Sequence, residues 1–270
     1  MPIGASLHIG LNAVDPKHYS GWDGQLTACE FDANDMEALA KTRGFTKVTK
    51  RLTKKATRNR VLSDIKAAAK KLKRDDIFFL TYSGHGGQVP NTGNDFEPDG
   101  YDETWCLYDG ELIDDELYTA LKQFVRGVRI FVLSDSCHSG TVLRAAHFSA
   151  LNLKPVRPRM MPRDVALRVY MDHEKFYDKL QKPRATQRKR MDASAVLISG
   201  CQDNQTSADG DRNGLFTETL LAVWKNGKFD GDYHGFHQSI VKLMPPTQSP
   251  NYFTKGRTSE QFEEQKPFTV

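Results

Sequence analysis

The sequence predicts an α/β fold with a central, mostly parallel, twisted sheet of about six or more strands, flanked by helices on both faces. Residues 77–83, 128–134 and 195–200 are short apolar runs rich in β-branched and aromatic residues, which is typical of strands that are covered on both faces. Amphipathic helical patterns separate most of these runs, as expected for parallel strands. Each run ends in small and polar residues, at the sheet edge where open α/β folds bind ligands.

The first half of the chain alternates strand and helix patterns. Residues 6–12 alternate apolar and small residues and predict the first strand, and 45–52 predict a second, more exposed one. Residues 28–43 predict a helix that stops at Gly44. A second helix begins at Thr57 and has a lysine- and arginine-rich outer face, most simply a solvated surface.

The polar, acidic residues 91–109 predict a loop after the strand at 77–83. A helix over 114–124 then returns the chain to the strand at 128–134, and a right-handed crossover makes that strand a parallel neighbour of 77–83. After the strand at 195–200 we expect helices over 215–225 and 234–243, and residues 267–270 could add a final strand.

Composition indicates one globular domain over residues 1–270. The chain is 39% apolar, which is enough for a substantial core. No signal peptide and no apolar run of membrane-spanning length is apparent, so we expect a cytoplasmic monomer without a membrane partner. The four cysteines lack the spacing of a zinc site or a disulfide framework, which fits a reducing compartment.

Cys137 is the candidate nucleophile. An isolated cysteine is usually an inert, buried small residue, but Cys137 is bracketed by Asp135, Ser136 and His138 at the end of a buried strand. These neighbours are polar, which argues against a core role. A reactive thiol needs a base or a cationic neighbour that stabilises the thiolate.

His85 is the candidate base. It lies between glycines just past the strand at 77–83, where the backbone can adopt unusual dihedral angles and approach closely. If the strands that precede His85 and Cys137 are parallel neighbours, both side chains reach the same edge. The topology therefore predicts a Cys–His dyad. No triad carboxylate is evident, so the backbone alone could orient His85.

Two further features each have two interpretations. Asp32 lies on the inner stripe of the first helix, where it is either an acid favoured by the helix dipole or a buried acid one turn from Cys29. Residues 151–192 are strongly basic and contain prolines; we interpret them as a linker or insertion with at most one short helix. The excess positive charge lies largely here, which weakens the case for a nucleic-acid-binding protein.

Three motifs resemble the caspase-like cysteine peptidases, and most of all the metacaspases and their prokaryotic relatives, the orthocaspases. The matching segments are Tyr82-Ser83-Gly84-His85-Gly86, Asp135-Ser136-Cys137-His138-Ser139-Gly140 and residues 198–209. Caspases have the histidine about 50 residues before the cysteine, and His85 precedes Cys137 by 52. The Gln-Ala-Cys signature of true caspases is absent, since Asp135 and Ser136 precede Cys137.

The resemblance implies a caspase-like fold, with a large-subunit-like part at 1–150, the basic linker at 151–192 and a small-subunit-like part at 193–270. It also implies cleavage after Arg or Lys, with an acidic P1 pocket that corresponds here to Cys29, Asp32, Ser83 and Asp135. We expect the backbone N–H groups of Gly86 and Cys137 to hold the oxyanion, and the linker to be cut by the enzyme itself.

Calcium is a further implication of the resemblance, because many metacaspases bind an activating Ca²⁺ through acids that correspond to Asp102, Asp114 and Asp115. All three also fit ordinary roles in a loop or at a helix N-terminus. The family has another aspartate after the nucleophile where this chain has Arg144, which should weaken the site by repulsion. We expect weak binding or, by preference, calcium-independent activity, with no cofactor required.

The sequence therefore predicts a cysteine endopeptidase acting on proteins or peptides with a basic P1 residue. One alternative is a catalytically silent caspase-like module that binds a basic peptide or partner in the same acidic cleft. Another is a nucleic-acid-binding arm formed by the basic segment, which is disfavoured because that segment has few aromatic residues for stacking.

Overall fold

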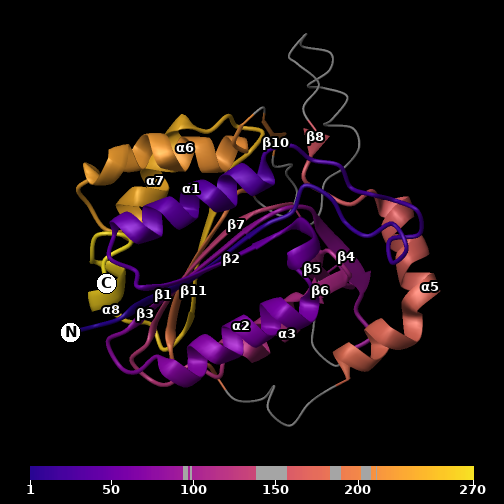
Figure 1. Ribbon diagram of the computed structural model, residues 1–270, viewed down its shortest axis with the longest axis horizontal. Coiled ribbons are helices and arrows are strands. Elements are labelled where there is room, and N and C mark those ends of the chain that lie inside the picture. The colour runs from indigo at the N-terminus through magenta and orange to yellow at the C-terminus, as the bar shows by residue number, and fades with distance from the viewer. Residues whose placement is uncertain (94–96, 98, 138–156, 183–189, 202–207, 211) are drawn as a thin grey trace.

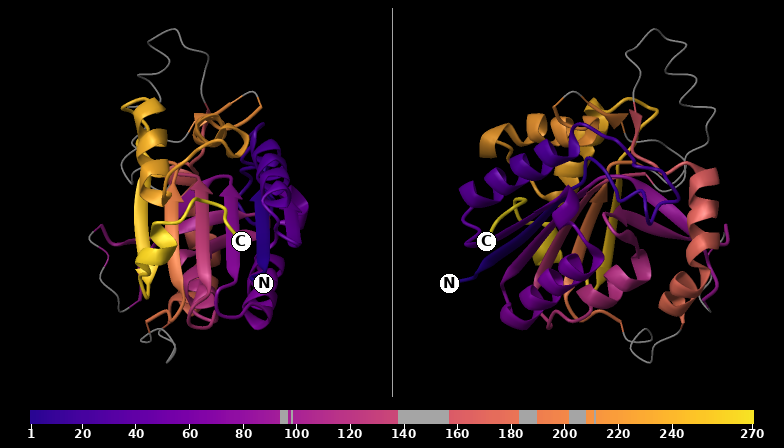
Figure 2. Two further views of the ribbon diagram at one scale, coloured as in Figure 1. Left: turned by 90° about the vertical axis from the view of Figure 1, so that its left-hand side faces the viewer. Right: turned by 45° about the vertical axis from the view of Figure 1, so that its right-hand side comes forward.

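The six-stranded central sheet confirms the predicted fold class. The computed structural model describes residues 1–93, 97, 99–137, 157–182, 190–201, 208–210 and 212–270. The sheet has the order β11-β9-β7-β3-β1-β2, and all neighbours are parallel except β11, which runs antiparallel to β9. Figure 2 shows this order across the sheet, from yellow β11 to indigo β1 and purple β2. The strands are β1 (Gly4–Gly10), β2 (Lys47–Leu52), β3 (Ile77–Ser83), β7 (Arg129–Asp135), β9 (Ser194–Ser199) and β11 (Asn251–Gly256).

Helices cover both faces of this sheet (Figure 1). On one face lie α1 (Cys29–Thr42), α6 (Leu215–Trp224) and α7 (Tyr233–Leu243), and on the other lie α2 (Arg58–Lys71) and α3 (Asp114–Leu121). Alternate side chains of each central strand enter opposite cores: on β3, Phe79 packs on the first face while Phe78 and Leu80 pack on the second. The short elements η1 (Thr53–Lys55), η2 (Lys225–Gly227) and α8 (Glu260–Glu263) connect or end these layers.

A second, three-stranded antiparallel sheet occupies much of the region predicted as a loop. It consists of β4 (Gly86–Pro90), β5 (Tyr101–Leu107) and β6 (Gly110–Ile113), so the loop predicted over 91–109 was wrong. Its polar composition concealed the strands, because some of these polar side chains are buried and paired with one another. Thr104 on β5 donates a hydrogen bond to Glu111 on β6, and both residues are buried.

The basic segment contains a long helix, so the prediction of at most one short helix was also wrong. Helix α5 (Arg163–Gln181) has 19 residues and a kink at His173. It packs Val165, Val169 and Tyr177 against the three-stranded sheet, so a narrow apolar stripe among many charges is enough to dock it. Strand β8 (Arg157–Pro158) pairs with β10 (Ala208–Asp209) just before this helix. Residues 151–156 and 183–189 of the segment lie outside the described residues.

The sixth central strand is β11, not the predicted strand at 267–270. In β11 half-buried and exposed residues alternate at the sheet edge, a weaker signal than the central strands give. The C-terminal residues instead place Phe268 in the core, against the rings of Phe79, Phe131 and Trp224. Within the described residues, no helix has the length and apolarity needed to cross a membrane.

Phe131 is the residue for a test of the core. Its ring is fully buried on β7 and contacts Phe79, Tyr233 and Phe268. Phe131→Ala should lower the free energy of unfolding by about 3–5 kcal/mol, because it removes buried apolar area and leaves a cavity. Phe253→Ala on β11, where the side chain is 40% exposed, should cost about 1 kcal/mol or less. Urea unfolding of both variants measures the difference. Equal losses of unfolding free energy would show that Phe131 contributes no more to the core than Phe253 does.

Candidate active site

Strand register brings His85 and Cys137 to one edge of the sheet. Neighbouring strands β3 and β7 pair Ser83 with Asp135, and His85 and Cys137 each follow two residues later. The glycines beside His85 permit close approach. A Cβ on Gly84 would lie 2.6 Å from the hydroxyl of Tyr82, which is too close for any other residue without rearrangement.

His85 is buried and its ring is held by the backbone. Its Nε2 lies 3.0 Å from the carbonyl oxygen of Gly24, so this nitrogen carries the proton, and Trp22 packs on the ring with centroids 4.7 Å apart. Among the described residues Nδ1 has no hydrogen-bond partner. Burial lowers the pKa of His85 to about 4, although the hydrogen bond to Gly24 opposes this shift. At neutral pH the imidazole is therefore neutral and Nδ1 can accept a proton.

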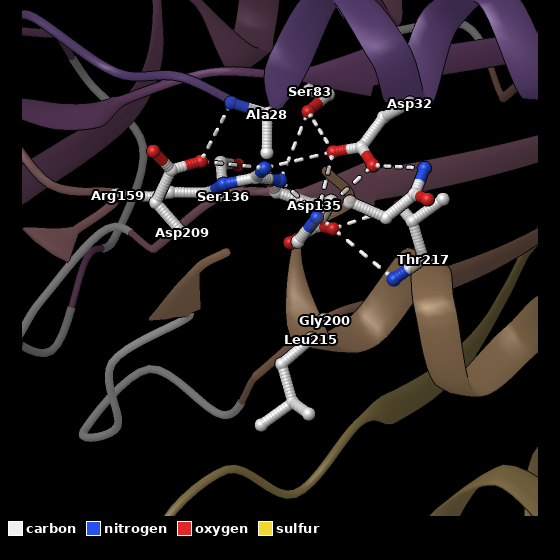
Figure 3. Close-up of polar contacts among 12 residues, drawn as sticks. Ala28, Asp32, Ser83, Asp135, Ser136, Arg159, Gly200, Asp209, Leu215 and Thr217 are labelled. Atoms are coloured by element: carbon white, nitrogen blue, oxygen red, sulfur yellow. Dashed lines mark hydrogen bonds and ion pairs between the residues drawn. The ribbon is translucent and has the colours of Figure 1, made fainter. Parts of the chain in front are cut away.

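The acidic pocket beside this edge is filled by Arg159 of the chain's own linker (Figure 3). Its guanidinium is completely buried and forms ion pairs of 2.8 Å with Asp32, 2.8 Å with Asp135 and 3.0 Å with Asp209. It also donates a hydrogen bond of 2.9 Å to the hydroxyl of Ser83. Three carboxylates from different elements thus surround one cation.

Surrounding groups fix the carboxylates of this pocket. Asp32 accepts hydrogen bonds from the backbone N–H of Gly214 and the amide of Asn213. Asp135 accepts one from the hydroxyl of Thr217 at the start of α6. Asp209 accepts two from backbone N–H groups at the start of α1. Because the carboxylates are held in place, the pocket is pre-organised for a cation.

Burial and the neighbouring charges shift the pKa values of the ionisable groups in the pocket. Burial raises the pKa of Asp32, as does the nearby Asp135, while Arg159 opposes both effects. Burial disfavours the charged form of Arg159, but Asp135, Cys29, Asp32 and Asp209 together raise its pKa well above the usual value. The cation therefore stays charged. Without a cation, three carboxylates would be buried together at a cost of several kcal/mol.

The backbone around Arg159 is hydrogen-bonded to the segments that carry His85 and Cys137. The carbonyl oxygen of Arg159 accepts hydrogen bonds from the N–H of Gly86, at 3.0 Å, and of Cys137, at 3.1 Å. On the N-terminal side, β8 pairs with β10. On the C-terminal side, the N–H of Met161 donates to the carbonyl of Gly86 at 2.8 Å. The backbone on both sides of Arg159 is therefore held, by β10 before it and by the segment after β3 behind it.

Of the four residues expected in the P1 pocket, three contact Arg159 directly: Asp32, Ser83 and Asp135. The fourth, Cys29, is buried at the start of α1 beside them, and burial raises the pKa of its thiol. Our prediction missed Asp209, although it ends the third motif. The acidic side chain of Asp209 could have suggested a role in binding a cation, but its place in the pocket depends on the pairing of β10 with β8.

The acids proposed for calcium gather at one place without forming a metal site. The charges of Asp115, Glu103 and Asp102 raise the pKa of the exposed Asp114, so the acids are close enough to repel one another. No set of three metal-ligating side chains within the described ranges could hold an ion. Arg144 lies outside the described residues. The residues that are described do not fit a calcium site, and the expectation of weak binding or calcium-independent activity stays a prediction.

Comparisons with known proteins identify the family of the chain. The model of the caspase domain matches residues 13–266. Metacaspase-1 of Candida albicans is 30% identical over 256 residues, which cover 80% of this chain and 55% of that protein. Metacaspase-1 of Arabidopsis thaliana is 35% identical over 150 residues, which cover 53% of this chain and 35% of that protein. The chain spans about half the length of the curated metacaspases that it matches.

Two solved structures resemble the whole chain. The crystal structure of protein GSU0716 from Geobacter sulfurreducens has a TM-score of 0.89 and 56% identity, and the match covers 100% of this chain and 99% of that one. Caspase-1 from Spodoptera frugiperda has a TM-score of 0.54 and 12% identity, and the match covers 96% of this chain and 88% of that one. This likeness shows a shared fold alone. Because the caspase-domain match spans nearly the whole chain, the chain belongs to the caspase-domain family of cysteine peptidases, and it is similar to metacaspases.

Proposed function

We propose that this protein is an endopeptidase that cleaves after Arg or Lys through Cys137 and His85, and that it cuts its own linker after Arg159. The observation that carries this proposal is the buried Arg159, whose guanidinium meets three carboxylates while its carbonyl oxygen meets two backbone N–H groups. Such a pair of donors is the arrangement that stabilises an oxyanion in acyl transfer.

The chemistry follows from these positions. The Nδ1 atom of His85 accepts the proton of Cys137, and the thiolate attacks the carbonyl carbon of the P1 residue. The N–H groups of Gly86 and Cys137 stabilise the oxyanion. The protonated His85 then donates to the leaving amine, and water hydrolyses the thioester with His85 again as base.

Pocket geometry supports a preference for arginine over lysine. The two terminal nitrogens of Arg159 share the three carboxylates: one nitrogen meets Asp135, and the other meets Asp32 and Asp209. A lysine has a single ammonium and cannot reproduce this forked contact. Protein or peptide substrates with Arg at P1 should therefore be cleaved faster than those with Lys.

The catalytically silent module remains the second candidate function. The same observation favours it, because Arg159 could close the cleft permanently as an internal ligand. Turnover separates the two candidates, since a silent module binds a basic peptide without cutting it.

The first prediction concerns the dyad. Cys137→Ala should abolish cleavage of an Arg-terminated fluorogenic peptide, and His85→Ala should lower kcat/KM by at least ~10²-fold, because only the thiolate attacks. Cys106→Ala, a change at another buried cysteine on β5, serves as the control and should keep its activity. Substantial activity in purified Cys137→Ala would disprove the dyad.

The second prediction concerns P1 specificity. Asp135→Asn and Asp32→Asn should each lower kcat/KM for Arg substrates by at least ~10²-fold, because the substrate cation loses a buried partner. Asp164→Asn, at an exposed aspartate on α5, should have no such effect. Preferred cleavage after Asp would contradict the basic pocket.

Gly214 gives a steric version of the same test. A Cβ at this position would lie 2.5 Å from Cζ of Arg159, while its φ of −63° suits any residue. Gly214→Ala should therefore block Arg and Lys substrates, and it should lower the thermal unfolding midpoint of the uncut chain because it displaces Arg159 from the three carboxylates. Wild-type kcat/KM in this variant would show that P1 binds elsewhere.

The third prediction concerns self-cleavage. Incubated wild type should give a new C-terminus at Arg159 and a new N-terminus at Met160, detected by mass spectrometry, and the two fragments should stay associated through the sheet. Arg159→Gln and Cys137→Ala should remain uncut at this bond. Arg163→Gln, a nearby exposed position, should be cut like wild type. If wild type and Cys137→Ala stay equally intact, self-processing is wrong.

The fourth prediction concerns calcium. Peptidase rates in excess EGTA and in millimolar Ca²⁺ should agree within about twofold, because the described acids do not converge on one ion and a calcium site needs six to eight oxygens. Titration of Ca²⁺ against the rate makes the measurement. Strong activation at micromolar Ca²⁺ would show that the acids near Asp114 do form a site.

A further inference from the structure

Cys201 lies directly against Cys137 at the edge of the sheet. The two Sγ atoms are 2.8 Å apart, and both residues are buried. A disulfide has an S–S length of about 2.05 Å, so the sulfurs need to approach by less than 1 Å. No disulfide joins the two cysteines here.

Strand topology brings the two thiols together. Cys137 follows β7 and Cys201 follows β9, which are parallel neighbours that pair Ser134 with Ser199. Neighbouring strands lie about 4.8 Å apart, within the range of about 4.4–6.8 Å that a disulfide spans between its Cα atoms. The backbone N–H of Gly200 donates to the carbonyl of Ser134 at 2.7 Å, which keeps the segment before Cys201 beside β7.

We propose that Cys137 and Cys201 form a reversible disulfide under oxidation by a hydroperoxide, and that this disulfide switches the peptidase off. The inference rests on the proposed function in one respect, namely that Cys137 is the nucleophile. Cys201 acts as the resolving cysteine. Neither the P1 pocket nor the oxyanion donors use its thiol, so the catalytic steps leave this contact unexplained.

The chemistry balances in two steps. The Cys137 thiolate attacks one oxygen of the hydroperoxide, the O–O bond breaks, and the leaving alkoxide or hydroxide takes a proton; Cys137 loses two electrons and becomes a sulfenic acid. The sulfur of Cys201 then attacks the sulfenic sulfur, and the S–O bond breaks. Hydroxide leaves with the Cys201 proton as water, and the S–S bond forms.

The disulfide has two consequences for the enzyme. It removes the thiolate, so attack on a peptide bond stops until a dithiol reduces the bond. It also competes with further oxidation of the sulfenic acid to sulfinic acid, which is irreversible in most proteins. An adjacent thiol thus turns damage to Cys137 into a recoverable state.

The experiment treats wild type, Cys201→Ser and Cys106→Ala with hydrogen peroxide, and each protein is compared with its own starting activity. Wild type and Cys106→Ala should lose activity and regain most of it in dithiothreitol. Cys201→Ser should regain at least fivefold less, with Cys137 recovered as sulfinic or sulfonic acid. Equal recovery in Cys201→Ser would overturn the proposal.

Peptide mapping gives a readout that needs no activity. Oxidised wild type is alkylated without reduction and digested, and a cross-linked peptide joining Cys137 to Cys201 should appear and disappear with dithiothreitol. The peptide should be absent from Cys201→Ser. If the cross-link forms in a protein without peptidase activity, the proposed function fails and the disulfide stands; if activity is present and no cross-link forms, the disulfide fails alone.

Discussion

The contact between Arg159 and three buried carboxylates is the interaction on which the active-site region depends. Asp32 comes from α1, Asp135 from the end of β7 and Asp209 from β10, so the three are brought together only in the folded chain. Three negative charges in one buried site repel one another, and a guanidinium can bind all of them. The pocket is therefore a site that requires a cation.

Arg159 connects the acidic pocket to the segments that carry His85 and Cys137. The side chain of Arg159 anchors it in the pocket, and its carbonyl oxygen then reaches the N–H groups of Gly86 and Cys137. These two amides belong to the segments that follow β3 and β7, whose parallel register also aligns His85 with Cys137. Neighbouring β9 adds Cys201 to this edge, so one sheet edge gathers the proposed base, the proposed nucleophile and a second thiol.

Much of this arrangement was predictable from the sequence. Continuous apolar runs identified β3, β7 and β9, because strands covered on both faces carry little else. Polar residues at the ends of these runs pointed to His85 and Cys137 as candidate catalytic residues. Because parallel strands end at the same edge of a sheet, the two side chains were expected to lie there together. The acidic type of Asp32 on an inward helix stripe left two interpretations open, and the resemblance to metacaspases then placed it in the pocket. The three-stranded sheet and β11 were missed because buried polar pairs and edge strands lack the apolar run.

The sequence by itself determined the parallel strands and the two candidate catalytic side chains that follow them, because these follow from local pattern and parallel topology. The expectation of an acidic pocket beside them came from the resemblance to metacaspases. The tertiary structure alone decided which of the many basic linker residues enters the pocket. The docking of α5 and the pairing of β8 with β10 hold Arg159 in place from both sides. It also decided that Asp209 completes the pocket and that Cys201 touches Cys137, because long-range contacts of this kind leave no periodic trace in the chain.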